Sequence, residues 1–333
     1  MNRRGLATAA GTVLLAAGAR RLVRARRLAA RTTGSPPAVR TDDGVGLHVE
    51  VAGPDDAPLA VLLVHGLGAR ATTLDAQWAA LRACYRVIRY DQRGHGASGW
   101  AGPRSATVHR LGRDLEQVVE TRCGKGPVVV VGHSMGGMAV LALAGRRPDL
   151  FGTRITGAAL LSTTAAPLPG TGSGTTATGR VRRSLATAGA WSLWAVAPVV
   201  AAAGPFRRRG VQRELRRRLF AGDPPPSAVG AMARTWGATP LAVPAAFLAG
   251  LADYDQRYAV RALATVPVLV LAGTEDATIP PAAARRLAHR LRGAELVLVP
   301  GAGHMVPLTH PAEVDEALAG LLERAAAGGR EDP

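Results

Sequence analysis

Three side chains that lie far apart in the sequence have the types that acyl-transfer chemistry needs. Ser134 stands at the centre of a Gly-x-Ser-x-Gly pattern that runs from Gly132 to Gly136. A serine hydroxyl is a weak nucleophile until a base removes its proton. His304 is a candidate for that base, and Asp276 is a candidate for the acid that orients it. Their order along the chain is serine, aspartate, histidine.

The glycines around Ser134 have a steric explanation. A serine that presents its hydroxyl above a sheet must occupy a strained turn between a strand and a helix. A side chain two residues before or after it would collide with its neighbours, so glycine is expected at both places. The small-residue segment 135–144 predicts the helix, whose N-terminus favours negative charge beside the serine. The alternative is a glycine-rich turn whose serine only caps the helix.

Each of the three side chains comes after a segment with the pattern of a buried strand. Four valines, residues 128–131, precede the serine, and such an uninterrupted apolar run is typical of a strand buried on both faces. The apolar run 266–272 precedes Asp276, and the run 295–299 precedes His304. Parallel sheets bind their ligands at the carboxyl ends of the strands, so we expect the three side chains to converge there.

The rest of the chain alternates strands with helices, which predicts a mainly parallel sheet with right-handed crossovers. The predicted strands are a hairpin over 39–51 with its turn at 42–44, and then 59–64, 85–90, 128–131, 155–162, 266–272 and 295–299. The predicted helices are 73–81, 108–121, 135–144, 281–291 and 311–326.

Residues 165–240 interrupt this alternation. They are rich in glycine, proline, threonine and arginine, with helical stretches around 191–200 and 211–220. We therefore predict three parts. Residues 1–38 form an N-terminal basic and apolar segment with a linker, 39–164 and 241–333 form the core, and 165–240 form a helical cap.

The net charge of +17 is concentrated in two places. Residues 1–40 contribute +9 and residues 165–240 another +9, which leaves −1 for everything else. Basic patches of this kind suit anionic lipid or acidic ligands, although they are also consistent with solvated arginine faces. None of the recognised nucleic-acid motifs is present, so we expect no nucleic-acid partner. Two cysteines are too few for a metal-ligand cluster.

The N-terminal segment bears on localisation. Residues 6–19 are apolar but shorter than the about 20 residues that span a bilayer, and they resemble a signal-peptide core or an interfacial segment. Six arginines between residues 20 and 31 oppose export of the chain beyond them. We expect a cytoplasmic protein or one held at the inner membrane face. Secretion is the alternative.

Taken together, the motifs resemble the α/β-hydrolase-fold serine hydrolases, a broad group of esterases, monoacylglycerol-lipase-like enzymes and cofactor-free haloperoxidases. The resemblance covers roughly residues 39–163 and 241–323. It implies an α/β fold with a mostly parallel eight-stranded sheet flanked by helices. It also implies a helical cap inserted after the sixth strand.

The resemblance implies a role for each site residue. Ser134 corresponds to the nucleophile, Asp276 to the acid and His304 to the base. The oxyanion hole corresponds to the backbone N–H groups of Leu67 and Met135. No metal and no organic cofactor is implied.

Other polar residues near these motifs have weaker claims. His65 and His95 lie in turns that such enzymes use to keep their shape. Glu275 is next to the expected acid, while Asp253 and Asp255 are rival acids ahead of the penultimate strand.

The expected activity is cleavage of a carboxylic ester with a hydrophobic acyl group. A cofactor-free haloperoxidase or perhydrolase, or a C–C bond hydrolase, would use the same three residues. An alternative of another class is a non-catalytic membrane-docking protein. The expected partners are a small hydrophobic ester and an anionic membrane, touched through the N-terminal segment or the cap. Five aromatic residues of the cap either line an apolar pocket or simply form the core of the cap: Trp191, Trp194, Phe206, Phe220 and Trp236.

Overall fold

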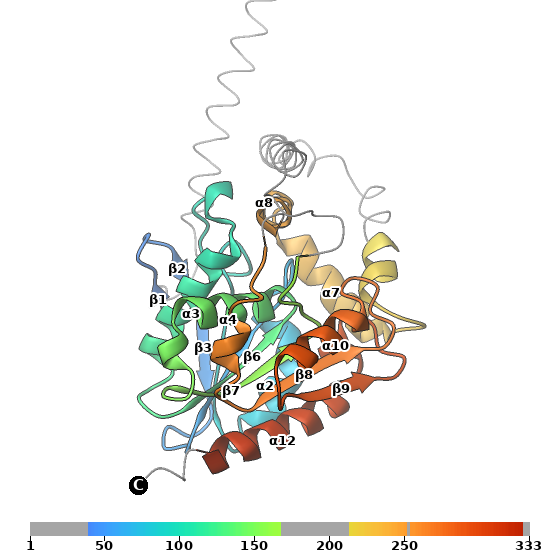
Figure 1. Ribbon diagram of the computed structural model, residues 1–333. Helices are drawn as coiled ribbons and strands as arrows, with labels where there is room; N and C mark the ends of the chain where they lie inside the picture. The colour runs from blue at the N-terminus through green and yellow to red at the C-terminus, as the bar shows by residue number, and fades with distance from the viewer. Residues whose placement is uncertain (1–38, 168–212, 252–253, 329–333) are drawn as a thin grey trace, which may run out of the picture.

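A seven-stranded sheet organises the part of the chain that the structure, a computed structural model, describes: residues 39–167, 213–251 and 254–328 (Figure 1). The order of the strands across it is β3-β5-β4-β6-β7-β8-β9. Only the edge pair β3 and β5 is antiparallel. The strands are β3 (Val49–Ala52), β4 (Ala60–Val64), β5 (Arg86–Tyr90), β6 (Val128–His133), β7 (Ile155–Leu161), β8 (Val268–Gly273) and β9 (Glu295–Val299).

The prediction of eight strands in one sheet is wrong for the described residues. The expected hairpin forms, but its strands β1 (Val39–Arg40) and β2 (Gly46–Leu47) pair only with each other. Asp43, in the turn between them, pairs with Arg93 at 2.9 Å. Asp42, in the same turn, pairs with an arginine of the neighbouring helix. The hairpin lies beside α3 and leads directly into the edge strand β3 (Figure 1).

Helices cover both faces of the sheet at the positions that the apolar spacing predicts. One face packs against α3, α4, α9 and α10, and the other against α2 and α12. The described elements are η1 (Ala71–Leu74), α2 (Asp75–Leu81), α3 (Val108–Arg122), α4 (Met135–Arg146), α9 (Val260–Leu263), α10 (Pro281–Arg290), α11 (Val306–Thr309) and α12 (Pro311–Gly328), with single-turn 3₁₀ helices at Pro103–Ser105 and Pro148–Leu150.

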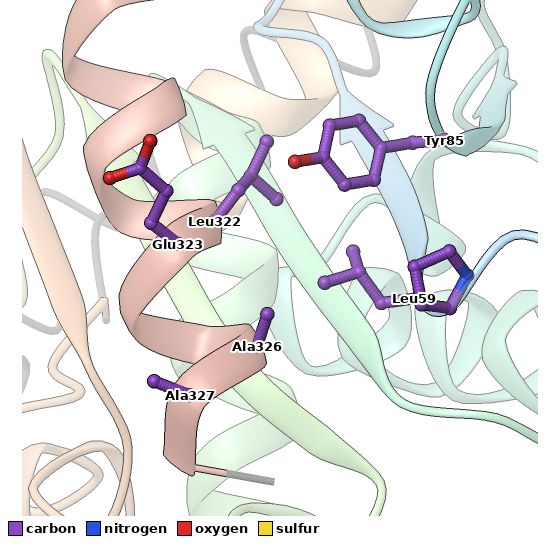
Figure 2. Close-up of a pocket in the computed structure, with 7 residues that line it drawn as sticks. Leu59, Tyr85, Leu322, Glu323, Ala326 and Ala327 are labelled. Atoms are coloured by element: carbon purple, nitrogen blue, oxygen red, sulfur yellow. The ribbon is translucent and has the colours of Figure 1, made fainter. Parts of the chain in front are cut away.

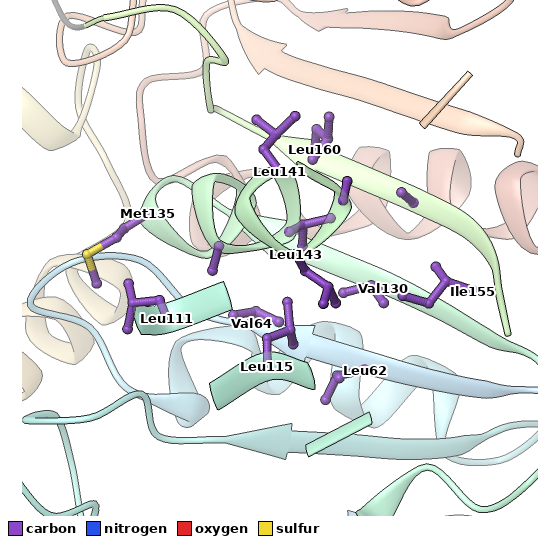
Figure 3. Packing of buried hydrophobic residues seen from close by; sticks show 14 of the residues in the cluster. Leu62, Val64, Leu111, Leu115, Val130, Met135, Leu141, Leu143, Ile155 and Leu160 are labelled. Carbon is purple, nitrogen blue, oxygen red and sulfur yellow. The ribbon is translucent and has the colours of Figure 1, made fainter. Parts of the chain in front are cut away.

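The run of valines in β6 explains why this strand is buried on both sides. Val128 and Val130 point into the larger apolar cluster with α3 and α4, while Val129 and Val131 point into the cluster with α12. Figure 3 shows the first of these clusters, with Val130 close to Leu143 of α4. A fully buried valine side chain contributes about 1.5–3 kcal/mol, so this strand is strongly held in place.

Part of the predicted cap is described, namely residues 165–167 and 213–240. Residues 213–219 are helical, as predicted for 211–220, and α7 (Pro226–Ala238) and α8 (Ala242–Gly250) come next. These helices come after β7, which is the fifth strand of the large sheet because the hairpin lies outside it. The predicted helix around 191–200 lies outside the described residues. The division into a core and a cap stays a prediction.

The N-terminal segment, residues 1–38, also lies outside the described residues, and with it the expected apolar run. None of the helices in the described part of the chain is long and apolar enough to cross a membrane.

One buried ion pair joins the β5 end of the sheet to α3. The Arg93 guanidinium donates to both carboxylate oxygens of Asp114, at 2.5 and 2.6 Å, and both side chains are fully buried. Removing one partner of such a pair leaves an uncompensated charge in the interior.

We expect Asp114→Ala to lower the free energy of unfolding by up to about 3–5 kcal/mol, because the buried Arg93 loses two hydrogen bonds and keeps only the partly exposed Asp43 as a partner. Urea denaturation followed by circular dichroism measures this. The matched control is Asp42→Ala, since Asp42 also pairs with an arginine but its side chain is 49% exposed. The control should cost less than about 1 kcal/mol. Equal losses in the two variants would contradict the assignment of the buried pair.

Candidate active site

Ser134 lies in a strained turn between β6 and α4, as its flanking glycines predict. Its φ of 54° and ψ of −117° place it in a conformation that L-residues seldom adopt. A Cβ on Gly132 would lie 2.6 Å from the Cα of Gly137. A Cβ on Gly136 would lie 2.2 Å from the carbonyl oxygen of Val64. Glycine at these positions therefore allows the turn to close against β4 and α4.

Ser134, His304 and Asp276 form one continuous row of hydrogen bonds. Nε2 of His304 lies 2.9 Å from Oγ of Ser134, and Nδ1 of His304 lies 2.8 Å from Oδ2 of Asp276. Since a carboxylate accepts the Nδ1 proton, Nε2 is the nitrogen that is free to accept from the serine hydroxyl. The exposed fractions are 9% for Ser134 and 3% for each of the other two. The row is therefore largely shielded from water.

The loops after β8 and β9 bring the acid and the base to the serine. Asp276 is held by the N–H groups of Thr278 and Ile279, which both donate to its Oδ1 at 2.8 Å. The other Asp276 carboxylate oxygen is left for His304. On the serine side, Thr163 donates its hydroxyl to the Ser134 carbonyl oxygen at 2.8 Å. No local sequence pattern distinguishes Thr163, so its place beside the serine could not be predicted from the sequence.

Two of the three rival acids lie apart from this row. Glu275 is exposed while its neighbour Asp276 is buried. Asp255 forms an ion pair with Arg257 at 2.5 Å. Asp253 lies outside the described residues.

The two expected oxyanion donors belong to residues close to Ser134. Met135 is the first residue of α4, so its N–H has no partner within the helix. Leu67 comes directly after Gly66, and a Cβ on Gly66 would lie 3.1 Å from the Ser134 Cβ. Within the described residues, neither N–H group donates to another residue. Both groups are thus available to a ligand oxygen beside the serine.

Two neutral histidines hold the loop that carries Leu67, in agreement with the shape-keeping role expected for them. His65 donates from Nδ1 to the Gly66 carbonyl at 2.8 Å, and His95 accepts the Gly68 N–H at Nε2, at 3.1 Å. Burial lowers the pKa of both, and the pKa of His95 falls to about 3. A protonated His95 would lose its acceptor for Gly68, so the depressed pKa preserves the loop.

Trp236, on α7, packs against this same loop. A Cβ on Gly68 would lie only 2.4 Å from Cε2 of the indole. Trp236 belongs with a cluster that joins the described cap residues Phe220 and Met232 to Met305, beside His304. Phe220 and Trp236, two of the five aromatics named above, therefore pack in an apolar cluster, whereas their lining of a pocket stays a prediction. The other three expected aromatics, Trp191, Trp194 and Phe206, lie outside the described residues.

A pocket in the described residues lies away from Ser134. It lies at the start of β4 and beside the C-terminal part of α12, where Tyr85 and Leu322 face each other (Figure 2). Ser134 lies beyond the other end of the parallel strands, so this pocket is at the opposite edge of the sheet. Across the described ranges, there is no group of three or more histidine, cysteine, aspartate or glutamate side chains that could hold a metal ion.

The fold and the hydrogen-bonded row at its strand ends define the class of protein. A mainly parallel sheet with helices on both faces carries a serine on a strand-to-helix turn, with an acid and a histidine after later strands. This is the architecture of the α/β hydrolases. Residues 61–317 match the model of the Alpha/beta hydrolase family, and the chain belongs to that family and is a hydrolase.

The proteins and structures that are similar to this chain have different names. A Variovorax paradoxus protein named "Putative carbamate hydrolase RutD" is 31% identical over 288 residues, which are 85% of this chain and 98% of that protein. A malate-bound esterase structure from Thermogutta terrifontis is 27% identical with a TM-score of 0.70, covering 88% of this chain and 98% of that one. The enol-lactonase from Burkholderia xenovorans LB400 is 26% identical with a TM-score of 0.67, covering 87% and 100%.

The depressed pKa of His95 predicts how stability depends on pH. The unfolded chain binds a proton at His95 below about 6.5, whereas the folded chain does so only near 3. The unfolded state therefore binds more protons between these values, and the free energy of unfolding falls as the pH falls through this window.

We expect His95→Gln, which keeps a side-chain acceptor but cannot titrate, to make this fall shallower between pH 7 and pH 5. Urea denaturation at several pH values measures the slope. His109→Gln removes an exposed histidine on α3 and serves as the control. A slope for His95→Gln equal to that of the unmodified protein would rule out the buried neutral histidine.

Proposed function

We propose that this protein is a serine hydrolase that cleaves a carboxylic ester of a hydrophobic acyl group through an acyl-enzyme. Ser134 acts as the nucleophile, His304 as the base and Asp276 as the acid that orients it. The observation that carries the proposal is the unbroken row of hydrogen bonds from the Ser134 hydroxyl through His304 to Asp276. Membership of a family of hydrolases supports it.

Acylation can be derived from the direction of these hydrogen bonds. His304 takes the Ser134 proton at Nε2 while the serine oxygen attacks the ester carbonyl. The carbonyl oxygen becomes an oxyanion, and the N–H groups of Leu67 and Met135 donate to it. Asp276 stabilises the imidazolium that forms. The proton then passes from Nε2 to the leaving alkoxide, and the alcohol departs.

Deacylation uses the same groups, with water as the nucleophile and the Ser134 oxygen as the leaving group. His304 takes a proton from a water molecule, which attacks the acyl-enzyme carbonyl. The same two N–H groups hold the second oxyanion. When the carbonyl re-forms, the bond to Ser134 breaks and His304 returns the proton to the serine oxygen. The products are the alcohol and the acid, and the enzyme is regenerated.

A hydrophobic acyl group is proposed because apolar side chains border the site. Met305 follows His304 in the sequence. It packs in one apolar cluster with Phe220 and Met232, which belong to the described part of the cap. A backbone hydrogen bond also joins the His304 loop to the cap, since the Met305 N–H donates to the Leu219 carbonyl at 3.0 Å. We propose that residues 165–240 act as a lid whose apolar side lies over the acyl chain.

A second candidate is hydrolysis of a carbamate. The relative named as a carbamate hydrolase matches this chain over nearly its whole length, which favours this candidate over others on the same three residues. A carbamate and an ester with the same p-nitrophenyl leaving group and equal chain length would separate the two. The preferred substrate is the one with the higher kcat/KM.

We also propose a cytoplasmic location or attachment to the inner face of an anionic membrane. The sequence supports this through the arginines that come after the apolar run 6–19. Such contact would bring the enzyme close to esters that partition into lipid.

We expect Ser134→Ala to reduce ester turnover by about 10⁴- to 10⁶-fold, because the nucleophile is lost. Release of p-nitrophenol from p-nitrophenyl butyrate measures turnover. Ser162→Ala is the matched control: Ser162 is fully buried after β7, and its Oγ has no hydrogen-bond partner within the described structure. The control should retain its activity. A Ser134→Ala protein as active as the control would refute the proposal.

We expect kcat/KM on p-nitrophenyl octanoate to exceed that on the acetate by at least about ten-fold, because each buried CH₂ contributes about 0.8 kcal/mol. Initial rates over a series of acyl lengths measure this. The leaving group is the same throughout, so differences report the acyl pocket. Strict preference for acetate would count against a hydrophobic acyl substrate.

A further inference from the structure

His133 stands at the meeting point of the three loops that form the site. It is the last residue of β6 and directly precedes Ser134, and only 2% of it is exposed. Its Nε2 lies 2.9 Å from the carbonyl oxygen of His304. A carbonyl oxygen can only accept, so the proton of His133 resides on Nε2 and is donated to the His304 backbone.

The ring of His133 also contacts both neighbouring loops. It packs at an angle of 47° against the ring of His304, with the two centroids 5.2 Å apart. On its other side, a Cβ on Gly66 would lie 3.1 Å from Nδ1 of His133. His133 therefore lies between the His304 loop and the loop that carries Leu67.

The hydrogen bond from His133 joins residues at or after the ends of two strands that lie far apart in the sheet. β9, which leads into the His304 loop, is separated from β6 by β7 and β8. Neighbouring strands lie about 4.8 Å apart, so the His304 loop must reach back across roughly 14 Å to the serine. A tether from the nucleophile's own strand is the shortest way to hold the returning loop in place.

We propose that His133 is a positioning residue, whose Nε2–H donates to the His304 carbonyl and thereby sets His304 Nε2 at hydrogen-bond distance from Ser134 Oγ. This rests on the proposed function of Ser134 and His304. His133 does not touch the reacting atoms. It acts through the backbone of His304, and it does so from the residue next to the nucleophile, so the nucleophile and its base share one anchor.

The electrostatics of the site fit this role. His304 becomes positively charged whenever it holds the serine proton. Burial lowers the pKa of His133 to about 3, with the nearby His304 contributing in the same direction. His133 is thus a neutral donor at physiological pH. Its tether stays intact while its neighbour gains and loses a proton.

A matched pair of variants isolates the donor. His133→Gln keeps an N–H donor on a flexible side chain, and His133→Met has similar length and volume without one. His133→Phe keeps an aromatic ring without a donor, and it replaces His133→Met in the comparison if the methionine variant does not fold. Circular dichroism and thermal melting establish that each variant is folded. His109→Met, on the exposed surface of α3, controls for the substitution itself.

The rate of covalent labelling by a fluorophosphonate probe is the readout, because it reports activation of Ser134 without requiring the natural substrate. We expect His133→Met and His133→Phe to lower the maximal labelling rate by about 10- to 100-fold, as a misplacement of about 1 Å does. The probe concentration at half-maximal rate should change by less than about three-fold, because the tether orients the base and does not bind the probe. His133→Gln should label within about three-fold of the unmodified protein.

The outcomes separate the two proposals. Absence of labelling in the unmodified protein, or labelling equal to that of Ser134→Ala, overturns the proposed function itself. Efficient labelling of the unmodified protein together with equal rates in folded His133→Met or His133→Phe overturns the positioning role alone. A His133→Gln rate as low as that of His133→Met also overturns it, because the donor would then not be the cause.

Discussion

The backbone of Ser134 sets the constraint on which the rest of the site depends. A positive φ at a serine costs free energy, of the order of 1–3 kcal/mol, and persists only where the surroundings hold it. Here the surroundings are tightly packed, since Gly132 and Gly136 leave no room for a Cβ against α4 and β4. The strained turn lifts the hydroxyl out of the strand and toward the loops of later strands. The other groups of the site are arranged around that one oxygen.

Parallel strand order then determines which loops can reach the oxygen. The ends of β4, β6, β8 and β9 supply Leu67, Ser134, Asp276 and His304 in turn. Loops that converge from separate strands need cross-links, and buried neutral histidines provide several. His65, in the loop after β4, accepts the Gln92 N–H, and His95 accepts the Gly68 N–H of that same loop. His133 donates to the loop after β9. Burial keeps these rings uncharged, so they act as fixed donors and acceptors beside a histidine that is proposed to carry the moving proton.

Much of this arrangement can be predicted from local sequence patterns, and some of it cannot. Apolar runs that lead into Ser134, Asp276 and His304 predict strand ends, because burial and turn geometry are local properties. The hairpin outside the sheet is held by ion pairs such as Asp43 with Arg93, which are fifty residues apart. The bond from His133 to His304 joins residues 171 positions apart. Long-range contacts of this kind have no signature in one sequence. The sequence places His133 inside the Gly-x-Ser-x-Gly pattern, but it does not indicate the partner of that side chain.

The central claim is that Ser134 carries the acyl group between the two half-reactions. Mixing the enzyme with a slowly turned-over p-nitrophenyl ester, quenching in acid within the first turnover and sequencing the peptides by mass spectrometry tests it directly. We predict one acyl group per chain, attached to Ser134 and absent when water has completed the reaction. Ester cleavage with no acylated peptide, or with the acyl group on another residue, would contradict it.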